Sequence, residues 1–364
     1  MKAEVISEQQ GISIVLLFIL GNALIISIGA QAKSDIWLAV LIAIGMAIPV
    51  LTLYARLHYL LPGMDLFDIL QYGFGSVIGR ITGLIYVWFA FHLGSRVLRN
   101  FGEFIITVGL EETPQLLPIS ILAILCLWCV KEGLEVLGRF SNFFTRFVVI
   151  MVLGTSLLLL TEVDFSNLSP FLYHGMAPVT TAAFKILTFP FTETVIFTMV
   201  FSNFQKKSSP YKIYLIGLIL GGLILFITIT NEVLVLGSEL YETSYFPGYR
   251  AVQRINIRNF IQRLEILAGV TFLISGFVQL SICLLATCKG LAKVLNFDDY
   301  RFIVTPTTFL MVTMSILIYN SIIEMNRWAV EIWPVYAAPF QLGIPVVLWL
   351  ACELKMKLKG EYPA

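Results

Sequence analysis

Ten long apolar stretches constrain the fold of this 364-residue chain more than any other feature. A helix needs about 20 predominantly apolar residues to cross the hydrocarbon core of a bilayer. Stretches of this length therefore predict transmembrane helices, and we expect an all-α integral membrane protein with a single polytopic domain over residues 1–364. The ten expected spans are residues 11–31, 36–60, 80–108, 116–133, 142–161, 180–202, 212–236, 261–288, 303–322 and 333–353.

The composition agrees with a membrane environment and argues against several classes of function. Hydrophobic residues make up 58% of the chain and charged residues 13%, about half the charged fraction of a soluble domain. A net charge of +1 gives no general attraction to nucleic acid. Cys126 and Cys129 lie in an apolar stretch without a second cysteine pair or a histidine nearby, so they indicate small buried residues. No metal or cofactor is expected.

The loops differ in their content of Lys and Arg, and this difference orients the chain. With the N-terminus inside, most of the 24 Lys and Arg residues fall in the inner loops and tails. The positive-inside rule then predicts that both termini are cytoplasmic. The longest outer loop, residues 237–260, is the main exception because it is rich in Arg and Tyr. A solvated loop explains this composition, and so does a lid or a contact for a partner protein.

One expected span, residues 180–202, is interrupted by a proline and carries an acid beside it. Pro190 removes a backbone donor and clashes with the carbonyl of Ile186, which breaks a helix. Glu193 follows within one helical turn, where a charge is expensive in lipid. Free backbone groups persist at membrane depth only where protein or a water-filled cavity satisfies them. This segment therefore predicts a site inside the membrane.

A second interruption, at Gly21-Asn22-Ala23, lies at the matching position of the first span. Matching interruptions in the two halves of a transporter point to its binding site. The ten spans then form two inverted repeats of five helices, residues 11–161 and 180–353, with the first and sixth helices broken. Helix N-termini at such breaks suit a carboxylate and the opposing carbonyls suit an ammonium group, which predicts a pocket for a small zwitterion. Close helix packing is the alternative explanation of Gly21.

Four polar residues of the third span share one helix face, because they are spaced by four, three and four positions. They are His92, Arg96, Arg99 and Glu103. An ion pair between Arg99 and Glu103 near the interface is the simplest interpretation. An outer gate, or a contact to Glu193 or Glu265, is the alternative. His92 is interpreted as a packing residue, with a proton carrier as the alternative.

Two later spans carry further polar side chains. Ser275, Gln279 and Cys283 repeat every four residues on one face of the eighth span, and Gln279 is expected to form a pocket wall that faces the two breaks. Asn231 and Glu232, near the outer end of the seventh span, are interpreted as interfacial residues.

Four short motifs occur in order along the chain. They are Gln10-Gly-Ile-Ser-Ile14, Arg99-x-x-x-Glu103, Pro190-Phe-Thr-Glu-Thr-Val195 and Cys288-Lys-Gly-Leu291. With the five-plus-five layout, they resemble the endospore germination permease family over nearly the full length. This family contains the B subunits of spore germinant receptors and belongs to the amino acid–polyamine–organocation transporter superfamily, which has the LeuT-type fold.

The resemblance implies a receptor more than a pump. Family members bind a germinant, often an amino acid, at the broken helices, and they work with an A subunit and a lipoprotein C subunit in the spore inner membrane. Amino-acid-binding members carry a hydroxyl-bearing residue and an aromatic residue where this chain has Gln279 and Cys283. The ligand here can therefore be a different amino acid, a sugar or an ion. The implied binding positions are Gly21, Asn22, Ala23, Phe189, Pro190, Glu193, Gln279 and Cys283.

Two other functions fit the same sequence. A proton-coupled amino acid transporter of this fold would use Glu193 or His92 to carry the proton. The second of these functions is a ligand-gated ion or solute channel formed with partner subunits. An enzyme is not expected, because the chain has no HExxH motif, no GxSxG motif with a plausible base and no paired Asp in facing spans.

Overall fold

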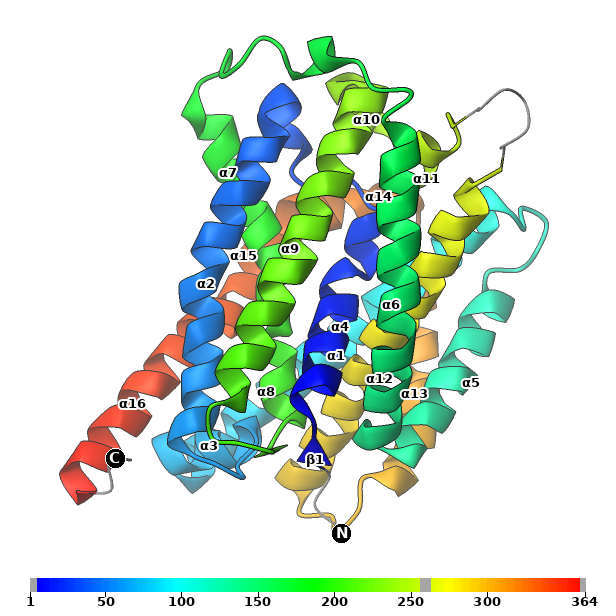
Figure 1. Ribbon diagram of the computed structural model, residues 1–364. Helices are drawn as coiled ribbons and strands as arrows, with labels where there is room; N and C mark the ends of the chain where they lie inside the picture. The colour runs from blue at the N-terminus through cyan, green and yellow to red at the C-terminus, as the bar shows by residue number, and fades with distance from the viewer. Residues whose placement is uncertain (1–4, 256–262, 361–364) are drawn as a thin grey trace.

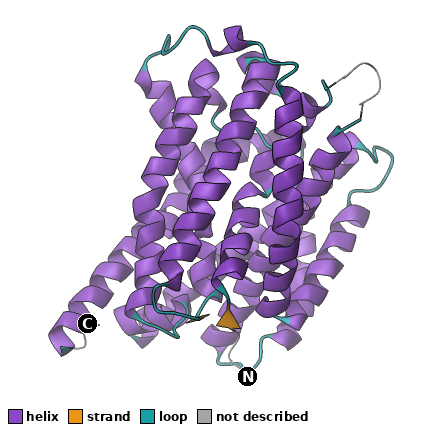
Figure 2. Ribbon diagram, in the orientation of Figure 1, coloured by secondary structure: helices purple, strands orange, loops and turns teal. Residues whose placement is uncertain are grey.

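The computed structural model describes residues 5–255 and 263–360, and in this part of the chain it is a bundle of helices (Figures 1 and 2). Two short strands, β1 (Val5–Ile6) and β2 (Asn203–Phe204), pair in parallel at the end of the bundle where the chain begins. The long helices run roughly side by side between the two ends (Figure 1). This architecture agrees with the all-helical fold that the apolar stretches predict.

The α-helices follow one another along the chain with short connections. They are α1 (Glu8–Leu20), α2 (Ile36–Leu60), α3 (Leu66–Phe74), α4 (Ser76–Val108), α5 (Leu116–Glu132), α6 (Leu134–Leu159), α7 (Met176–Ile186), α8 (Phe197–Val200), α9 (Ser209–Leu236), α10 (Ser238–Thr243), α11 (Pro247–Val252), α12 (Glu265–Leu295), α13 (Arg301–Leu317), α14 (Ile322–Arg327), α15 (Trp333–Ala338) and α16 (Ile344–Lys359).

Short 3₁₀ and π turns lie between some of these helices. The 3₁₀ turns are η1 (Asn22–Leu24), η2 (Ala30–Asp35), η3 (Phe165–Leu168) and η5 (Thr192–Ile196), and the π turns are η4 (Leu187–Phe191), η6 (Trp328–Ile332) and η7 (Pro339–Gly343). The last expected span, residues 333–353, is therefore part of a longer helical segment over Ile322–Lys359 that contains η6 and η7.

Seven helical segments of the described chain are long and apolar enough to cross a membrane. Two further apolar helices, α1 and α13, are shorter. Large apolar side chains such as Trp128, Phe143 and Leu157 are exposed on the outside of the bundle, as a lipid-facing surface requires. The chain is a multi-pass membrane protein, and the arrangement of ten spans stays a prediction. The seven segments are Ala30–Leu60, Ser76–Val108, Leu134–Leu159, Met176–Val200, Ser209–Leu236, Glu265–Leu295 and Ile322–Lys359.

Helix α1 lies in the interior of the bundle and packs against α6, α9 and α12 (Figure 1). Ser7 caps it, since its hydroxyl accepts a hydrogen bond from the backbone nitrogen of Gln10. Gly217 on α9 lets Val15 approach closely, because a Cβ at position 217 would meet the Val15 side chain. The side chains from Ile14 to Leu20 are consequently almost fully buried.

The expected outer loop, residues 237–260, is partly helical. Helices α10 and α11 occupy most of it as far as Ile255, and residues 256–260 lie outside the described residues. Helix α11 packs against α9 and α12, so this segment covers one end of the bundle.

Candidate ligand site at two helix interruptions

The first interruption follows α1, which ends at Leu20. Gly21 leaves helical geometry, with φ 0° and ψ −118°, and only the short turn η1 follows. A Cβ at position 21 would meet the side chain of Gln279 and the carbonyl oxygen of Phe18, the latter at 3.0 Å. Glycine is therefore required for α1 to approach α12 this closely. The freed backbone nitrogen of Asn22 donates to Gln279 Oε1 at 3.3 Å.

The second interruption lies between α7 and α8. Helix α7 ends at Ile186, and inside η4 Phe189 has an extended conformation with φ −146° and ψ 112°. Pro190 follows and supplies no N–H donor. The backbone then continues through η5 into α8, and all of η5 is buried. The carbonyls next to this interruption need partners from other elements.

Side chains from distant helices satisfy these freed backbone groups. The Gln341 side chain, fully buried in η7, donates from Nε2 to Thr188 O at 3.0 Å and accepts from Thr192 Oγ1 at 2.8 Å. The indole nitrogen of Trp333 also donates to Thr188 O, at 3.4 Å. The Tyr54 hydroxyl lies within hydrogen-bond distance of two carbonyls, Gln341 O at 2.5 Å and Thr192 O at 3.3 Å, and its one hydrogen serves one of them at a time.

The sequence analysis missed these three side chains. A lone buried amide in an otherwise apolar last span was the one signal for Gln341.

Helix α12 packs against both η1 and η5. Gln279 and Ser275 are fully buried one turn apart on the same face of α12, and Gln279 contacts the first interruption. Within the described residues, four side chains near the two interruptions retain polar atoms without a hydrogen-bond partner. These atoms are Asn22 Oδ1, Gln279 Nε2, Ser275 Oγ and both carboxylate oxygens of Glu193. Buried polar atoms are nearly always partnered, so such a group indicates a place for a ligand or water.

Glu193 is fully buried in η5. Among the described residues, Arg96 and Cys283 are ionisable side chains that interact with it electrostatically. The Trp333 indole lies nearby as well, but it donates its hydrogen to Thr188 O. An isolated buried carboxylate is costly, so Glu193 requires a proton, a cationic partner or water in this position.

The side chains of Arg96 and His92 extend from α4 and pack against aromatic rings of the segment from η6 to α15. The Arg96 guanidinium lies 4.0 Å from the ring centre of Trp333 and 4.9 Å from that of Trp328. Its Nε donates to the hydroxyl of Tyr319 at 3.1 Å. The ring of His92 has its centre 5.1 Å from that of Trp328 in an edge-on arrangement. These contacts hold Arg96 next to Glu193 by cation–π attraction.

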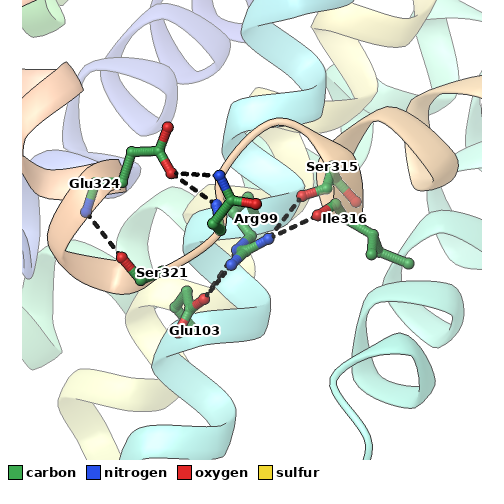
Figure 3. Close-up of polar contacts among 7 residues, drawn as sticks. Arg99, Glu103, Ser315, Ile316, Ser321 and Glu324 are labelled. Atoms are coloured by element: carbon green, nitrogen blue, oxygen red, sulfur yellow. Dashed lines mark hydrogen bonds and ion pairs between the residues drawn. The ribbon is translucent and has the colours of Figure 1, made fainter.

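Arg99 forms the ion pair that its spacing with Glu103 indicates, and Figure 3 shows this arrangement. Its Nε donates to Glu103 Oε1 at 2.8 Å, and both side chains are buried. Its Nη1 also donates to the carbonyls of Ser315 and Ile316, at 3.4 and 3.0 Å. Arg99 therefore ties α4 to the C-terminal end of α13, where free carbonyls attract a cation.

The remaining expected site residues are divided between this site and its neighbourhood. Cys283 is buried and interacts with Glu193, and Ala23 is buried beside Asn22. Phe189 is half-buried and instead lines a separate cavity of about 30 Å³, together with Lys185. The structure thus brings most of the expected residues together around η1, η5 and α12.

Comparison with known proteins gives the family. A sequence model described as "Spore germination protein" matches residues 5–324. The chain belongs to this spore germination protein family. It is 27% identical over 360 residues to spore germination protein KB of Bacillus subtilis, an alignment that covers 98% of this chain and 96% of that protein. It is also 23% identical over 220 residues to spore germination protein XB of Bacillus anthracis, with 60% of each chain covered.

Solved structures show which fold this spore germination protein shares. Mhp1, a nucleobase-cation-symport-1 family transporter solved in a closed conformation with bromovinylhydantoin, superposes with a TM-score of 0.71 at 12% identity, covering 94% of this chain and 77% of that one. MhsT in complex with L-phenylalanine superposes with a TM-score of 0.66 at 15% identity, covering 96% of each chain. Both are LeuT-fold transporters, and at these identities the likeness establishes the fold alone.

These findings confirm the expected family and place the chain in the LeuT-type fold. The family consists of permeases and receptor components rather than a class of enzymes.

Proposed function

We propose that this spore germination protein is the germinant-sensing membrane subunit of a germination receptor, and that it binds a small nutrient, best matched by an amino acid, at the two interruptions. The observation that carries the proposal is the group of unpartnered polar atoms on Asn22, Glu193 and Gln279. They come from three different elements, η1, η5 and α12, and α12 contacts the other two, whereas buried polar groups in proteins are nearly always partnered.

A zwitterionic amino acid matches the chemistry of these groups. Its ammonium group would pair with the Glu193 carboxylate and supply the hydrogen-bond donor that neither carboxylate oxygen has among the described residues. Its carboxylate would replace Gln279 Oε1 as the acceptor for the Asn22 N–H, at the start of η1. Gln279 would then be free to contact the ligand side chain and select it. MhsT, which shares the fold, was solved with L-phenylalanine, and this supports an amino acid ligand.

The wider assembly follows from the family and the charge distribution. We propose ten spans in two inverted repeats, residues 11–161 and 180–353, with both termini cytoplasmic and the protein in the spore inner membrane. A and C subunits of the receptor would complete the complex, and the outer segment 237–260 is a candidate contact for them. The protein would exist in two conformations, and ligand binding would favour one of them. The size of this shift is limited by the difference in ligand affinity between the two conformations.

Dose–response curves of spores test the binding site. Glu193→Gln and Gln279→Ala are each expected to raise the germinant concentration for half-maximal germination at least about tenfold, because each removes a buried polar contact worth about 1.5–3 kcal/mol. Glu111→Gln, which changes an exposed acid in the turn after α4, is the matched control and should leave the curve unchanged. Unchanged curves for both site variants, at normal receptor abundance, would overturn the assignment of the site.

A proton-coupled amino acid transporter is the second candidate, because the two solved structures described above, Mhp1 and MhsT, are LeuT-fold transporters. Uptake of labelled amino acid into proteoliposomes separates the two functions. Sustained accumulation driven by a proton gradient would establish the transporter. Saturable binding without flux would support the receptor.

A further inference from the structure

A small cavity lies apart from the proposed ligand site, between the end of η1 and helices α6, α9, α11 and α12. Its volume is about 40 Å³. One water-sized sphere needs roughly 10–15 Å³ by this measure, so the cavity has room for a single ion or a few waters and excludes an amino acid. The residues that line it with oxygen atoms include Leu24, Thr155, Thr228, Glu232 and Thr271.

Glu232 supplies the charge in this cavity. Its side chain is 5% exposed, so the interpretation of Glu232 as an interfacial residue is wrong. The reason is tertiary, since α11 and α6 both pack against the end of α9 and cover it. Within residues 5–255 and 263–360, no side chain or backbone group donates a hydrogen bond to its carboxylate, and none of the residues that line the cavity is basic.

The hydroxyl groups around Glu232 are oriented as acceptors. Thr155, Thr228 and Thr271 each donate their hydrogen to a carbonyl one turn earlier on their own helix, at 2.9, 3.1 and 2.9 Å. A hydroxyl oxygen that has donated its hydrogen still has lone pairs to offer. These three side chains therefore present lone pairs to the cavity, with their hydrogens directed away from it.

A backbone carbonyl completes the set of oxygen atoms. A Cβ at Gly248 would meet both Leu24 O and Glu232 Oε1, the second at 3.0 Å. Both oxygens therefore lie against the space that Gly248 leaves open. Leu24 is the last residue of η1, and among the described residues no backbone N–H donates to its carbonyl, because the helix does not continue after the first interruption.

We propose that this cavity binds one small monovalent metal cation, Na⁺ or K⁺. Oxygen atoms from carboxylate, carbonyl and hydroxyl groups are the ligands of hard cations, and here they converge without a competing N–H donor. A single carboxylate neutralises a single positive charge, whereas a divalent ion would leave an uncompensated buried charge. The bound cation joins the backbone after the first interruption to α6 and α9, and thereby stabilises the conformation of η1.

Cation-dependent stability of the purified full-length protein tests this proposal without any germinant. Its melting temperature is measured in NaCl, KCl and N-methyl-D-glucamine chloride at the same ionic strength. We expect a higher melting temperature in NaCl or KCl than in the organic salt, with a saturable dependence on the metal cation. Equal melting temperatures in the three salts would show that the cavity holds only water and would overturn the proposal.

Two variants connect the effect to the cavity. Glu232→Gln keeps the shape and removes the charge, and it should weaken the cation affinity at least about tenfold. Thr228→Val keeps the carboxylate and removes one oxygen ligand, so a smaller loss of affinity is expected. Glu242→Gln removes an exposed acid from the same end of the bundle and should behave as the wild type. A cation effect that persists unchanged in Glu232→Gln would also overturn the proposal.

The result is independent of the proposed receptor function. A cation effect that Glu232→Gln abolishes supports the cavity site even if Glu193→Gln leaves germination unchanged. Loss of germinant response in Glu193→Gln, conversely, says nothing in favour of the cation.

Discussion

The backbone nitrogen of Asn22 donates a hydrogen bond to Gln279 Oε1 at 3.3 Å, although 257 positions separate the two residues. This bond joins the first helix interruption to the middle of α12. Asn22 Oδ1 and Gln279 Nε2 then have no hydrogen-bond partner among residues 5–255 and 263–360. A ligand that binds here can therefore exchange an internal hydrogen bond for its own, which couples ligand binding to the contact between η1 and α12.

Gly21→Ala is expected to disturb this bond. The added Cβ would meet the Gln279 side chain and Phe18 O, so α1 and α12 must move apart. We expect a loss of about 1–3 kcal/mol in the free energy of unfolding, as for other overpacked sites, together with a weaker germinant response. Gly154→Ala is the control, because no atom lies within 4 Å of a Cβ there and alanine favours a helix. Thermal unfolding in detergent compares the two, and equal stability would contradict the role of Gly21.

Gln341→Leu is expected to destabilise the second interruption. The variant leaves Thr188 O with only the longer Trp333 bond, and the Thr192 hydroxyl keeps Leu187 O as its one acceptor. Buried polar groups that lose a partner cost about 1–3 kcal/mol each. Val347→Leu, at a position 56% exposed on α16, should be neutral in the same unfolding assay. A Gln341→Leu protein as stable as the wild type would show that water replaces the amide without cost.

Substitutions at Arg99 and Glu103 are expected to have strongly non-additive effects on the free energy of unfolding. Arg99→Met leaves the Glu103 carboxylate buried without its partner and should cost about 3–5 kcal/mol. The double variant Arg99→Met/Glu103→Met removes both charges and should lose less stability than the two single variants together. Four-way comparison of unfolding free energies measures the coupling. Simple additivity would mean that Arg99 acts mainly through the carbonyls of Ser315 and Ile316.

Asp65, between α2 and α3, predicts a dependence of stability on pH. The pKa of this acid is raised from 3.8 to about 6, mainly by burial and then by the nearby charge of Asp68, while Lys293 opposes the change. A pKa that is higher in the folded state means that the folded protein binds the proton more tightly. This contribution to stability is therefore fully present below about pH 4 and is lost as the pH rises through 6.

Asp65→Asn isolates this effect, because asparagine can still accept the capping hydrogen bond from the Asp68 nitrogen. Between pH 4 and pH 7, the free energy of unfolding of the wild type should fall by about 2 kcal/mol relative to that of the variant. Unfolding measured across this range checks the prediction. Parallel pH profiles of the two proteins would exclude Asp65 as the group that titrates.

Local patterns predicted part of the candidate site. Gly21 lies directly after the last residue of α1 and Pro190 lies within η4, because the backbone preferences of glycine and proline act on the nearest residues. The Arg99–Glu103 pair was predictable for a similar reason, since residues four apart meet on a helix. Gln341 and Trp333 were not predictable in this way, because they reach Thr188 from segments about 150 positions away.

Glu232 shows the same division between local and tertiary information. Its place near the end of an apolar helix suggested an interfacial residue, and packing by α6 and α11 buried it instead. The sequence by itself determined the membrane environment, the helical class and the residues at which helices stop, because these depend on apolar length and local backbone chemistry. Only the tertiary structure decided which polar groups find partners and which are left for a ligand or an ion, because those contacts join residues far apart in the chain.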